Sequence, residues 1–163
     1  KHITMLDTIL RGNFLKNRNA YIVSGEPAIF HCHHYNCYLQ AVLLDASSYI
    51  NGIPELLINA AHELSYDQFS LFFKANPTLK FEQKKYVVED YFRFCGFGSI
   101  SLNKVNDDGG IVETKSEHYG IGWKAKFGMS KTPVSFFTRG FLAGATEAIY
   151  GLKPGSLDCM QDR

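Results

Sequence analysis

The sequence predicts an α+β fold in which a layer of helices packs on an antiparallel sheet. Three observations lead to this prediction. Helical spacing of apolar residues dominates positions 37–94, the apolar period changes to two on both sides of the NDDG turn at 106–109, and a long helical pattern returns at 133–150. Strands that are joined by so short a turn pair in antiparallel fashion.

The first elements lie at the N-terminal end of the chain. Alternating residues at 21–30 predict two short strands with a turn at 25–27. The apolar residues of 37–49 have helical spacing, and Asn36 is suited to cap this helix. The histidine- and cysteine-rich run at 31–37 therefore straddles the predicted start of the helix.

Three more helices are predicted before the sheet. Positions 53–64 and 66–75 both show helical periodicity, and Ser65 between them is suited to cap the second helix. Positions 81–94 repeat apolar and aromatic residues at helical spacing, and Gly96 follows as a natural stop. These segments supply most of the predicted helical layer.

The sheet and the last helix follow. Positions 98–105 and 110–118 alternate around the turn and predict a β-hairpin. Positions 133–150 form the last long helix, which Gly151 ends. We expect positions 156–160 to return as a further strand.

Length and composition bound the number of domains and the class of partner. The chain has 163 residues, of which 45% are hydrophobic and 14% aromatic, enough for one core and too few for two ordinary domains. We expect a single domain over 1–163, with an N-terminal segment at 1–50 and a core at 51–163. Lys and Arg total 17 against 16 Asp and Glu, so the chain has no large positive net charge that would attract nucleic acid.

The sequence also predicts where the protein resides. No apolar run approaches the roughly 20 residues that span a bilayer, and the N-terminus lacks the pattern of a signal peptide. We expect no membrane partner and a cytoplasmic protein with reduced cysteines, because four cysteines are too sparse for a disulfide framework. The first residue is Lys1 rather than Met, and the chain stops at Arg163 in a strand-like stretch, so we expect a trimmed piece.

The segment whose residues most clearly indicate a chemical role is the run at 31–37, which reads HCHHYNC. Metal or redox chemistry is the usual reason for gathering such side chains, which pack poorly as a group. Imidazole and thiolate donors suit zinc, and a histidine suits iron or heme. The expected metal ligands are His31, His33, His34 and Cys37. Alternatively, the cysteines are buried apolar side chains and the histidines are exposed or hydrogen-bonded.

A thiolate nucleophile is another use of the same run. An adjacent imidazolium lowers the pKa of a thiol, and a neutral imidazole can act as its base. Cys32 and Cys37 are the candidate catalytic residues. The sequence identifies no third group that would orient a base, as a catalytic triad requires.

A second candidate site lies around the last helix. Two aromatic pairs are placed to line a cavity between sheet and helix, namely Tyr119 with Trp123 and Phe136 with Phe137. A flat ligand suits such a cavity, although the same rings would serve equally as core. His118 beside them is either a ligand contact or a structural histidine.

Three motifs punctuate the second half of the chain. They are FCGFG at 94–98, HYGIGW at 118–123 and FFTRGFLAG at 136–144. In this order they resemble the four-vinyl-reductase domain family, and the resemblance runs from about Leu57 to Arg163. It implies the α+β fold of a small-ligand binding domain, a fold shared with heme nitric-oxide sensors and a Golgi transport complex subunit.

The resemblance also implies a ligand class, a small apolar or aromatic molecule or a tetrapyrrole. In some aromatic-sensing members of the family, the strands after the glycine-rich helix bind zinc through an acidic residue and cysteines. Here Gln161 stands near the acidic position, and Cys159 is the only cysteine nearby. The run at 31–37 lies outside the resemblance.

Three functions are compatible with these patterns. The leading hypothesis is a binding or sensory domain for a small apolar, aromatic or tetrapyrrole-like molecule, in which the run at 31–37 closes the pocket or binds a metal. The second is a metal- or thiol-dependent enzyme that uses the same run. The third is an interaction scaffold, a homodimer whose last helices meet at Gly140 and Gly144.

Overall fold

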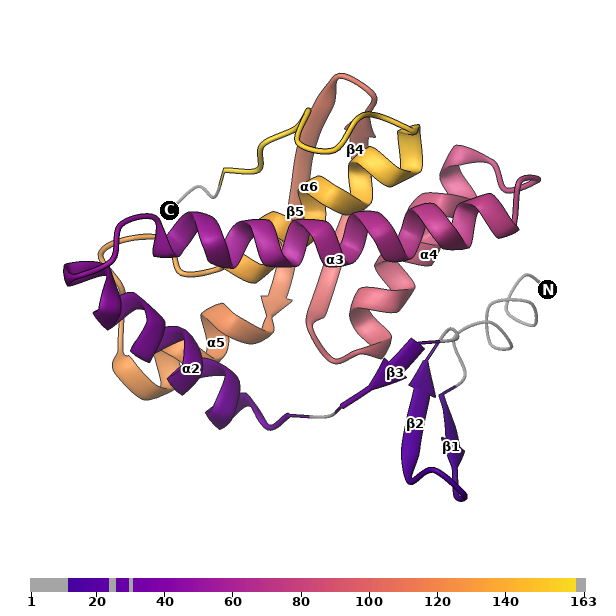
Figure 1. Ribbon diagram of the computed structural model, residues 1–163. Coiled ribbons are helices and arrows are strands. Elements are labelled where there is room, and N and C mark those ends of the chain that lie inside the picture. Colours follow the sequence, from indigo (N-terminus) through magenta and orange to yellow (C-terminus); the bar gives the residue numbers. More distant parts are fainter. Residues whose placement is uncertain (1–11, 24–25, 30, 161–163) are drawn as a thin grey trace. The chain divides into compact units, whose positions relative to one another are not determined.

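The chain divides into two compact units, each described here by itself. They comprise residues 1–32, the N-terminal unit, and residues 33–163, the C-terminal unit. The boundary between the two units falls inside the histidine- and cysteine-rich run. The sequence predicts a longer N-terminal segment, at 1–50. The structure, a computed structural model, describes residues 12–23, 26–29 and 31–160, and its elements are labelled as in Figure 1.

The N-terminal unit contains a three-stranded antiparallel sheet in its described part. The strands are β1 (Asn13–Leu15), β2 (Ala20–Val23) and β3 (Glu26–Ala28), and β2 lies in the middle. The strand pair predicted within 21–30 is confirmed by β2 and β3. The sequence does not predict β1, because three residues are too few to show an alternating pattern.

The C-terminal unit combines helices with one β-hairpin. The helices are α2 (His33–Asp45), α3 (Ile53–Ala75), α4 (Phe81–Phe94), α5 (His118–Phe127) and α6 (Phe136–Tyr150), with a short 3-10 helix, η1 (Ala46–Ser48), after α2. The hairpin pairs β4 (Gly98–Asn106) with β5 (Gly109–Glu117) in antiparallel fashion. This architecture confirms the predicted α+β class. Within the described ranges, no helix has both the length and the apolar character needed to cross a membrane.

Helix α6 forms the centre of the C-terminal unit, and α3 lies along it (Figure 1). Two glycines of α6 permit this close approach. A Cβ atom at Gly140 would lie 2.0 Å from the carbonyl oxygen of Ile58, and one at Gly144 would lie 2.2 Å from that of His62. Both glycines are thus covered by α3 of the same chain. The homodimer stays a prediction, but these two positions are occupied by packing within the unit.

Phenylalanine rings fill the space between α6 and its neighbours. The ring centroid of Phe141 lies 5.7 Å from that of Phe69 in α3 and 5.1 Å from that of Phe92 in α4. All three side chains are buried, and burial of such a side chain contributes roughly 1.5–3 kcal/mol. From β4, Ile100 and Leu102 add to this core, at the two-residue spacing of one strand face.

The last helix, predicted at 133–150, begins only at Phe136. Two other helix boundaries differ from the prediction for local reasons. Helix α3 runs unbroken through Ser65, whose buried hydroxyl donates a 3.0 Å hydrogen bond to the carbonyl oxygen of Phe141 instead of capping a helix. Helix α2 begins at His33, before the predicted start. Asn36 therefore lies inside the first turn of α2, and its side-chain amide is 3.2 Å from the Nε2 atom of His118.

Helix α5 is the main element that the sequence does not predict. The carboxylate of Glu117 caps it by accepting hydrogen bonds from the backbone N–H groups of Tyr119 and Gly120. A Cβ atom at Gly122 would lie 2.6 Å from the Cys37 sulfur, so this glycine is required where α5 packs on α2. In contrast to the prediction for 156–160, the structure contains no strand after α6 within its described residues.

Candidate functional site

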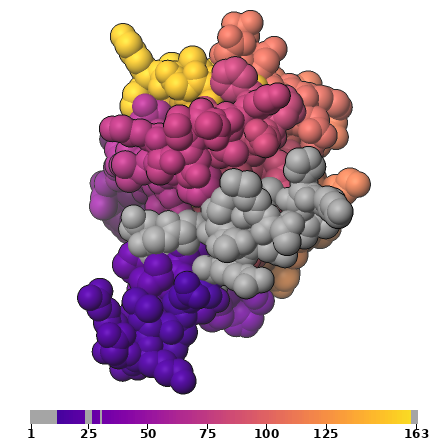
Figure 2. Space-filling model, turned by 90° about the vertical axis from the view of Figure 1, so that its right-hand side faces the viewer, coloured from indigo at the N-terminus to yellow at the C-terminus, as the bar shows by residue number. Residues whose placement is uncertain are grey.

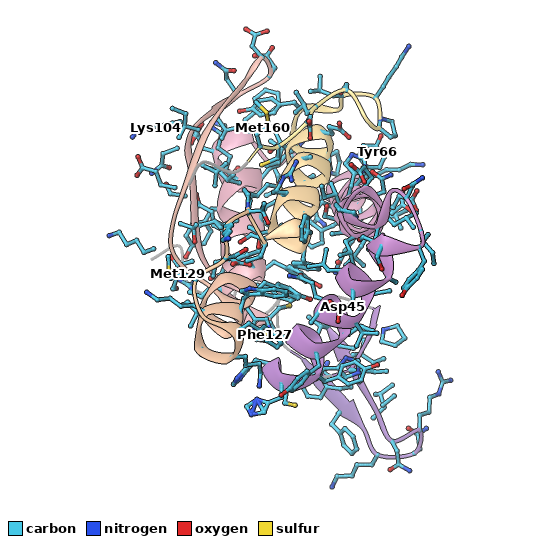
Figure 3. The ribbon with its side chains drawn as sticks, turned by 90° about the vertical axis from the view of Figure 1, so that its left-hand side faces the viewer. Asp45, Tyr66, Lys104, Phe127, Met129 and Met160 are labelled. Atoms are coloured by element: carbon cyan, nitrogen blue, oxygen red, sulfur yellow. The ribbon has the colours of Figure 1, made fainter. Side chains whose placement is uncertain are left out.

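A cavity of about 480 Å³ lies in the C-terminal unit beside α6 and is termed the α6 cavity. Its walls are the β4–β5 hairpin, one face of α6 and residues 157–160, termed the C-terminal wall. In Figure 2 the residues after α6 (yellow) and the loop end of the hairpin (orange) lie side by side at one end of this unit. Figure 3 shows Met160 of the C-terminal wall beside the strand that carries Lys104.

The helix contributes a single stripe of side chains to this cavity. These residues follow each other at spacings of one, three or four positions, which places them on one helix face, and they are Ser135, Thr138, Arg139, Leu142, Ala143 and Thr146. Much of the remaining wall is apolar. It comprises Val105, Ile111, Val112, Leu157 and Met160. An engineered apolar cavity of roughly 150 Å³ holds benzene, so the α6 cavity has room for a substituted or fused aromatic ring.

Glu117 is the buried polar centre of the site. One carboxylate oxygen accepts hydrogen bonds from the backbone N–H of Tyr119 at 3.1 Å and the hydroxyl of Thr138 at 2.6 Å. The other accepts from the backbone N–H of Gly120 at 2.5 Å and the hydroxyl of Ser135 at 2.9 Å. A buried carboxylate is stable when its lone pairs are satisfied in this way, and the N-terminal end of α5 adds a favourable dipole. Glu117 thus joins β5, α5 and α6 at the floor of the cavity.

A second buried carboxylate holds the C-terminal wall in place. Glu147 of α6 is fully buried and accepts hydrogen bonds from the backbone N–H groups of Gly155 at 3.1 Å and Leu157 at 2.8 Å. Nε2 of His62 lies 2.7 Å from the same carboxylate. The ring of Tyr66, labelled in Figure 3, is stacked on His62 from the next turn of α3. The C-terminal wall is therefore fixed to both central helices.

A smaller cavity of about 250 Å³ lies between α2, α3 and the starts of α5 and α6. Asn36, Gln40 and Tyr119 are its polar lining residues, and the amide of Gln40 donates a 2.8 Å hydrogen bond to the carbonyl oxygen of Val134. Burial, followed by the negative charge of Glu117, raises the pKa of Tyr119 to about 12. Its phenol group is therefore neutral at physiological pH.

The predicted aromatic site is divided in the structure. Tyr119 and Phe137 come together, with ring centroids 5.4 Å apart, and line the smaller cavity. Phe136 is buried in α6, and Trp123 packs against Phe127 with a centroid distance of 4.7 Å. Neither Phe136 nor Trp123 lines the α6 cavity or the smaller one. A ligand-binding role for these residues stays a prediction.

The histidine- and cysteine-rich run is split by the boundary between the units. His33, His34 and Cys37 belong to α2, whereas His31 and Cys32 are exposed residues that precede it. Nδ1 of His34 lies 3.1 Å from Nε2 of His33. In the part of the chain that the structure describes, no three His, Cys, Asp or Glu side chains are grouped to hold a metal ion. Zinc, iron or heme binding stays a prediction without geometric support.

The environment of Cys37 does not favour a nucleophilic thiolate. Its side chain is fully buried, and burial raises the pKa of the thiol, whereas reactive cysteines have a lowered pKa. Burial also lowers the pKa of His118, which keeps this imidazole neutral near pH 7. Catalysis by Cys32 or Cys37 stays a prediction.

Sequence reasoning missed the residues that line the α6 cavity. A signal for them was present, since Ser135 and the helix residues Thr138, Arg139 and Thr146 form a polar stripe in a largely apolar segment. Glu117 carried a weaker signal, as an acidic residue between a strand and a segment with two glycines. Neither signal indicates which distant segment forms the opposite wall.

Comparisons with known proteins support the fold. Neither a protein-family model nor a curated protein matches the chain, so the resemblance to the four-vinyl-reductase family is not confirmed. Among solved structures, the chain is similar to the phenol-responsive sensory domain of the transcription activator PoxR, crystallised with phenol. The TM-score is 0.72 with 14% sequence identity, and the match covers 90% of this chain and 76% of the other. At this identity the similarity shows a shared α+β fold.

Proposed function

We propose that the C-terminal unit is a sensory domain that binds a small aromatic molecule in the α6 cavity. The observation that carries this proposal is the α6 cavity itself, in which an apolar wall surrounds a few fixed polar groups. Sites for small molecules are usually of this kind and of this size. The shared fold with a phenol-responsive sensory domain supports the same class of ligand.

The arrangement of the walls suits sensing. The C-terminal wall, residues 157–160, contacts the cavity but belongs to no helix or strand, and it is fixed through the side chains of Glu147 and Arg139. A ligand that fills the cavity touches this wall directly. Occupancy therefore bears on the position of the C-terminal wall, whereas the hairpin and α6 are held by the core.

The polar groups of the cavity favour binding over catalysis. Both oxygens of Glu117 are engaged by four donors, so this carboxylate is poorly placed to accept a proton from a substrate. Cys159 is the only thiol in the lining, and burial raises its pKa. The enzyme hypothesis thus finds no activated nucleophile among the described cavity residues.

Two cavity-filling variants test this proposal. Val112→Trp places an indole into the α6 cavity from β5, and Ala60→Trp places one into the smaller cavity from an exposed position on α3. In calorimetric titrations with phenol, we expect Val112→Trp to weaken binding at least about tenfold, because the filled volume is no longer available. Ala60→Trp should leave the affinity within about twofold of the wild type.

A matched control lies on the same strand. Glu113 neighbours Val112 in β5, but its exposed side chain is not among the residues that line the cavity. Glu113→Trp should therefore bind phenol as the wild type does. Loss of binding in Ala60→Trp with normal binding in Val112→Trp would assign the ligand to the smaller cavity and contradict the proposal.

A further inference from the structure

Among the described residues that line the α6 cavity, Arg139 is the only lysine or arginine. It lies on α6, and its side chain is partly buried. Its Nε atom donates a 2.6 Å hydrogen bond to the carbonyl oxygen of Cys159. The guanidinium group is thus held against the C-terminal wall of the cavity instead of extending into solvent.

The two terminal amino groups of Arg139 have no protein partner in the described ranges. Within these ranges the arginine side chain makes no ion pair, and its only hydrogen bond is the one from Nε. A guanidinium presents five N–H donors in one plane, and two of them fit the two oxygens of a carboxylate. Partial removal of a cation from water is unfavourable unless an anion pairs with it. An anionic group in the cavity would supply that partner.

Four other polar side chains of the cavity are engaged within the protein, namely Thr114, Glu117, Ser135 and Thr138. Glu117 accepts four hydrogen bonds, two of them from the hydroxyls of Ser135 and Thr138. The hydroxyl of Thr114 lies 2.9 and 3.0 Å from two backbone carbonyl oxygens of the hairpin. Asp158 is exposed, where water and salt screen its charge. A ligand therefore meets Arg139 as the main charged donor that is still available.

From these contacts we propose that the ligand of the α6 cavity is an aromatic carboxylate. Its ring lies against the apolar wall, and its carboxylate oxygens accept hydrogen bonds from the terminal amino groups of Arg139. This inference rests on the proposed function and names the ligand class. Phenol has no carboxylate, so the proposal separates the specificity of this chain from that of the phenol-responsive domain with the similar fold.

Matched ligand pairs test this proposal by calorimetric titration. Benzoate is compared with benzyl alcohol, and 1-naphthoate with 1-naphthylmethanol, since each pair shares a ring and differs in charge. We expect the wild type to bind each carboxylate at least about tenfold more tightly than its alcohol, because charge-assisted hydrogen bonds are stronger than neutral ones. In Arg139→Gln this preference should disappear, while the affinity for the alcohols changes by less than about twofold.

Two further variants separate charge from structure. Arg139→Lys keeps the positive charge and should retain part of the preference for carboxylates, since an ammonium pairs with an anion but cannot bind it with two fixed donors. Lys124→Gln removes a charge from an exposed position of α5 outside the cavity and should leave all affinities unchanged.

The possible outcomes distinguish this inference from the proposed function. Equal wild-type affinities for the carboxylates and alcohols would overturn the ligand class and leave aromatic binding intact. Equal losses for both kinds of ligand in Arg139→Gln would show that the arginine only holds the C-terminal wall, which also overturns the inference. Failure of the wild type to bind any of these ligands would overturn both the inference and the proposed function.

Discussion

Gly144→Ala is expected to destabilise the C-terminal unit by about 3 kcal/mol or more. The new Cβ atom would lie 2.2 Å from the carbonyl oxygen of His62 and 2.5 Å from the hydroxyl oxygen of Ser65. Both atoms belong to α3, and the carbonyl oxygen of His62 is part of its backbone, so α3 and α6 would have to separate. Chemical denaturation followed by circular dichroism measures this loss.

Gly151→Ala provides the control at the end of the same helix. No atom lies within 4 Å of a Cβ atom at Gly151, but its φ of +68° is in the left-handed region, so alanine there should cost only about 1 kcal/mol. Normal stability of Gly144→Ala, combined with loss of self-association, would contradict packing within the unit. That result would favour the dimer scaffold, the third function compatible with the sequence.

Glu117→Ala is expected to cost about 3 kcal/mol. The substitution removes the acceptor of four hydrogen bonds. Two backbone N–H groups and the hydroxyls of Ser135 and Thr138 then lack the carboxylate to which they donate. It also removes the cap of α5, which by itself contributes about 1 kcal/mol. The midpoint of denaturation should fall accordingly, and hydrogen exchange should increase first at the start of α5.

The matched control is Glu113→Ala on the same strand. Glu113 is exposed and pairs only with Lys104, so its removal should leave the denaturation midpoint unchanged. A Glu117→Ala protein as stable as Glu113→Ala would show that Glu117 does not organise the junction of β5, α5 and α6. The claim that Glu117 forms a fixed polar floor of the α6 cavity would then be wrong.

The elements that the sequence predicts well are those determined by local pattern. Helix α4 has the predicted bounds because its apolar residues keep one period over 81–94 and Gly96 follows. The hairpin forms at the predicted turn because Asn106 and Gly109 pair across two aspartates, and Gly109 has a φ of +115°. Neither element needs a distant partner to specify it.

The elements that the sequence does not predict depend on distant contacts. Helix α5 contains Gly120 and Gly122, which lower its intrinsic helix propensity, and it is stabilised by the Glu117 cap and by packing on Cys37 of α2. The residues after α6 read as a strand, yet hydrogen bonds to Glu147 direct them along the helix instead. Sequence patterns do not report such tertiary partners.

The candidate site also depends on contacts between distant segments, which local sequence patterns do not report. The aromatic residues that the sequence singled out are distributed over α5 and α6, and two of them line the smaller cavity. The α6 cavity joins β5, α6 and the C-terminal wall, and helix α5 separates β5 from the other two in the sequence. Its cationic residue, Arg139, lies inside the motif at 136–144, which by itself predicts only a fold.

The most direct test of the central claim is a crystal structure of the protein with 4-bromophenol, in which the anomalous signal of bromine locates the ligand. If the α6 cavity is the binding site, we expect a bromine peak between β5 and α6, with the ring against Val112 and Leu142. A bromine peak confined to the smaller cavity, near Tyr119 and Phe137, would contradict the claim. The absence of a peak from both cavities, in crystals prepared at a ligand concentration that saturates the protein in solution, would contradict it as well.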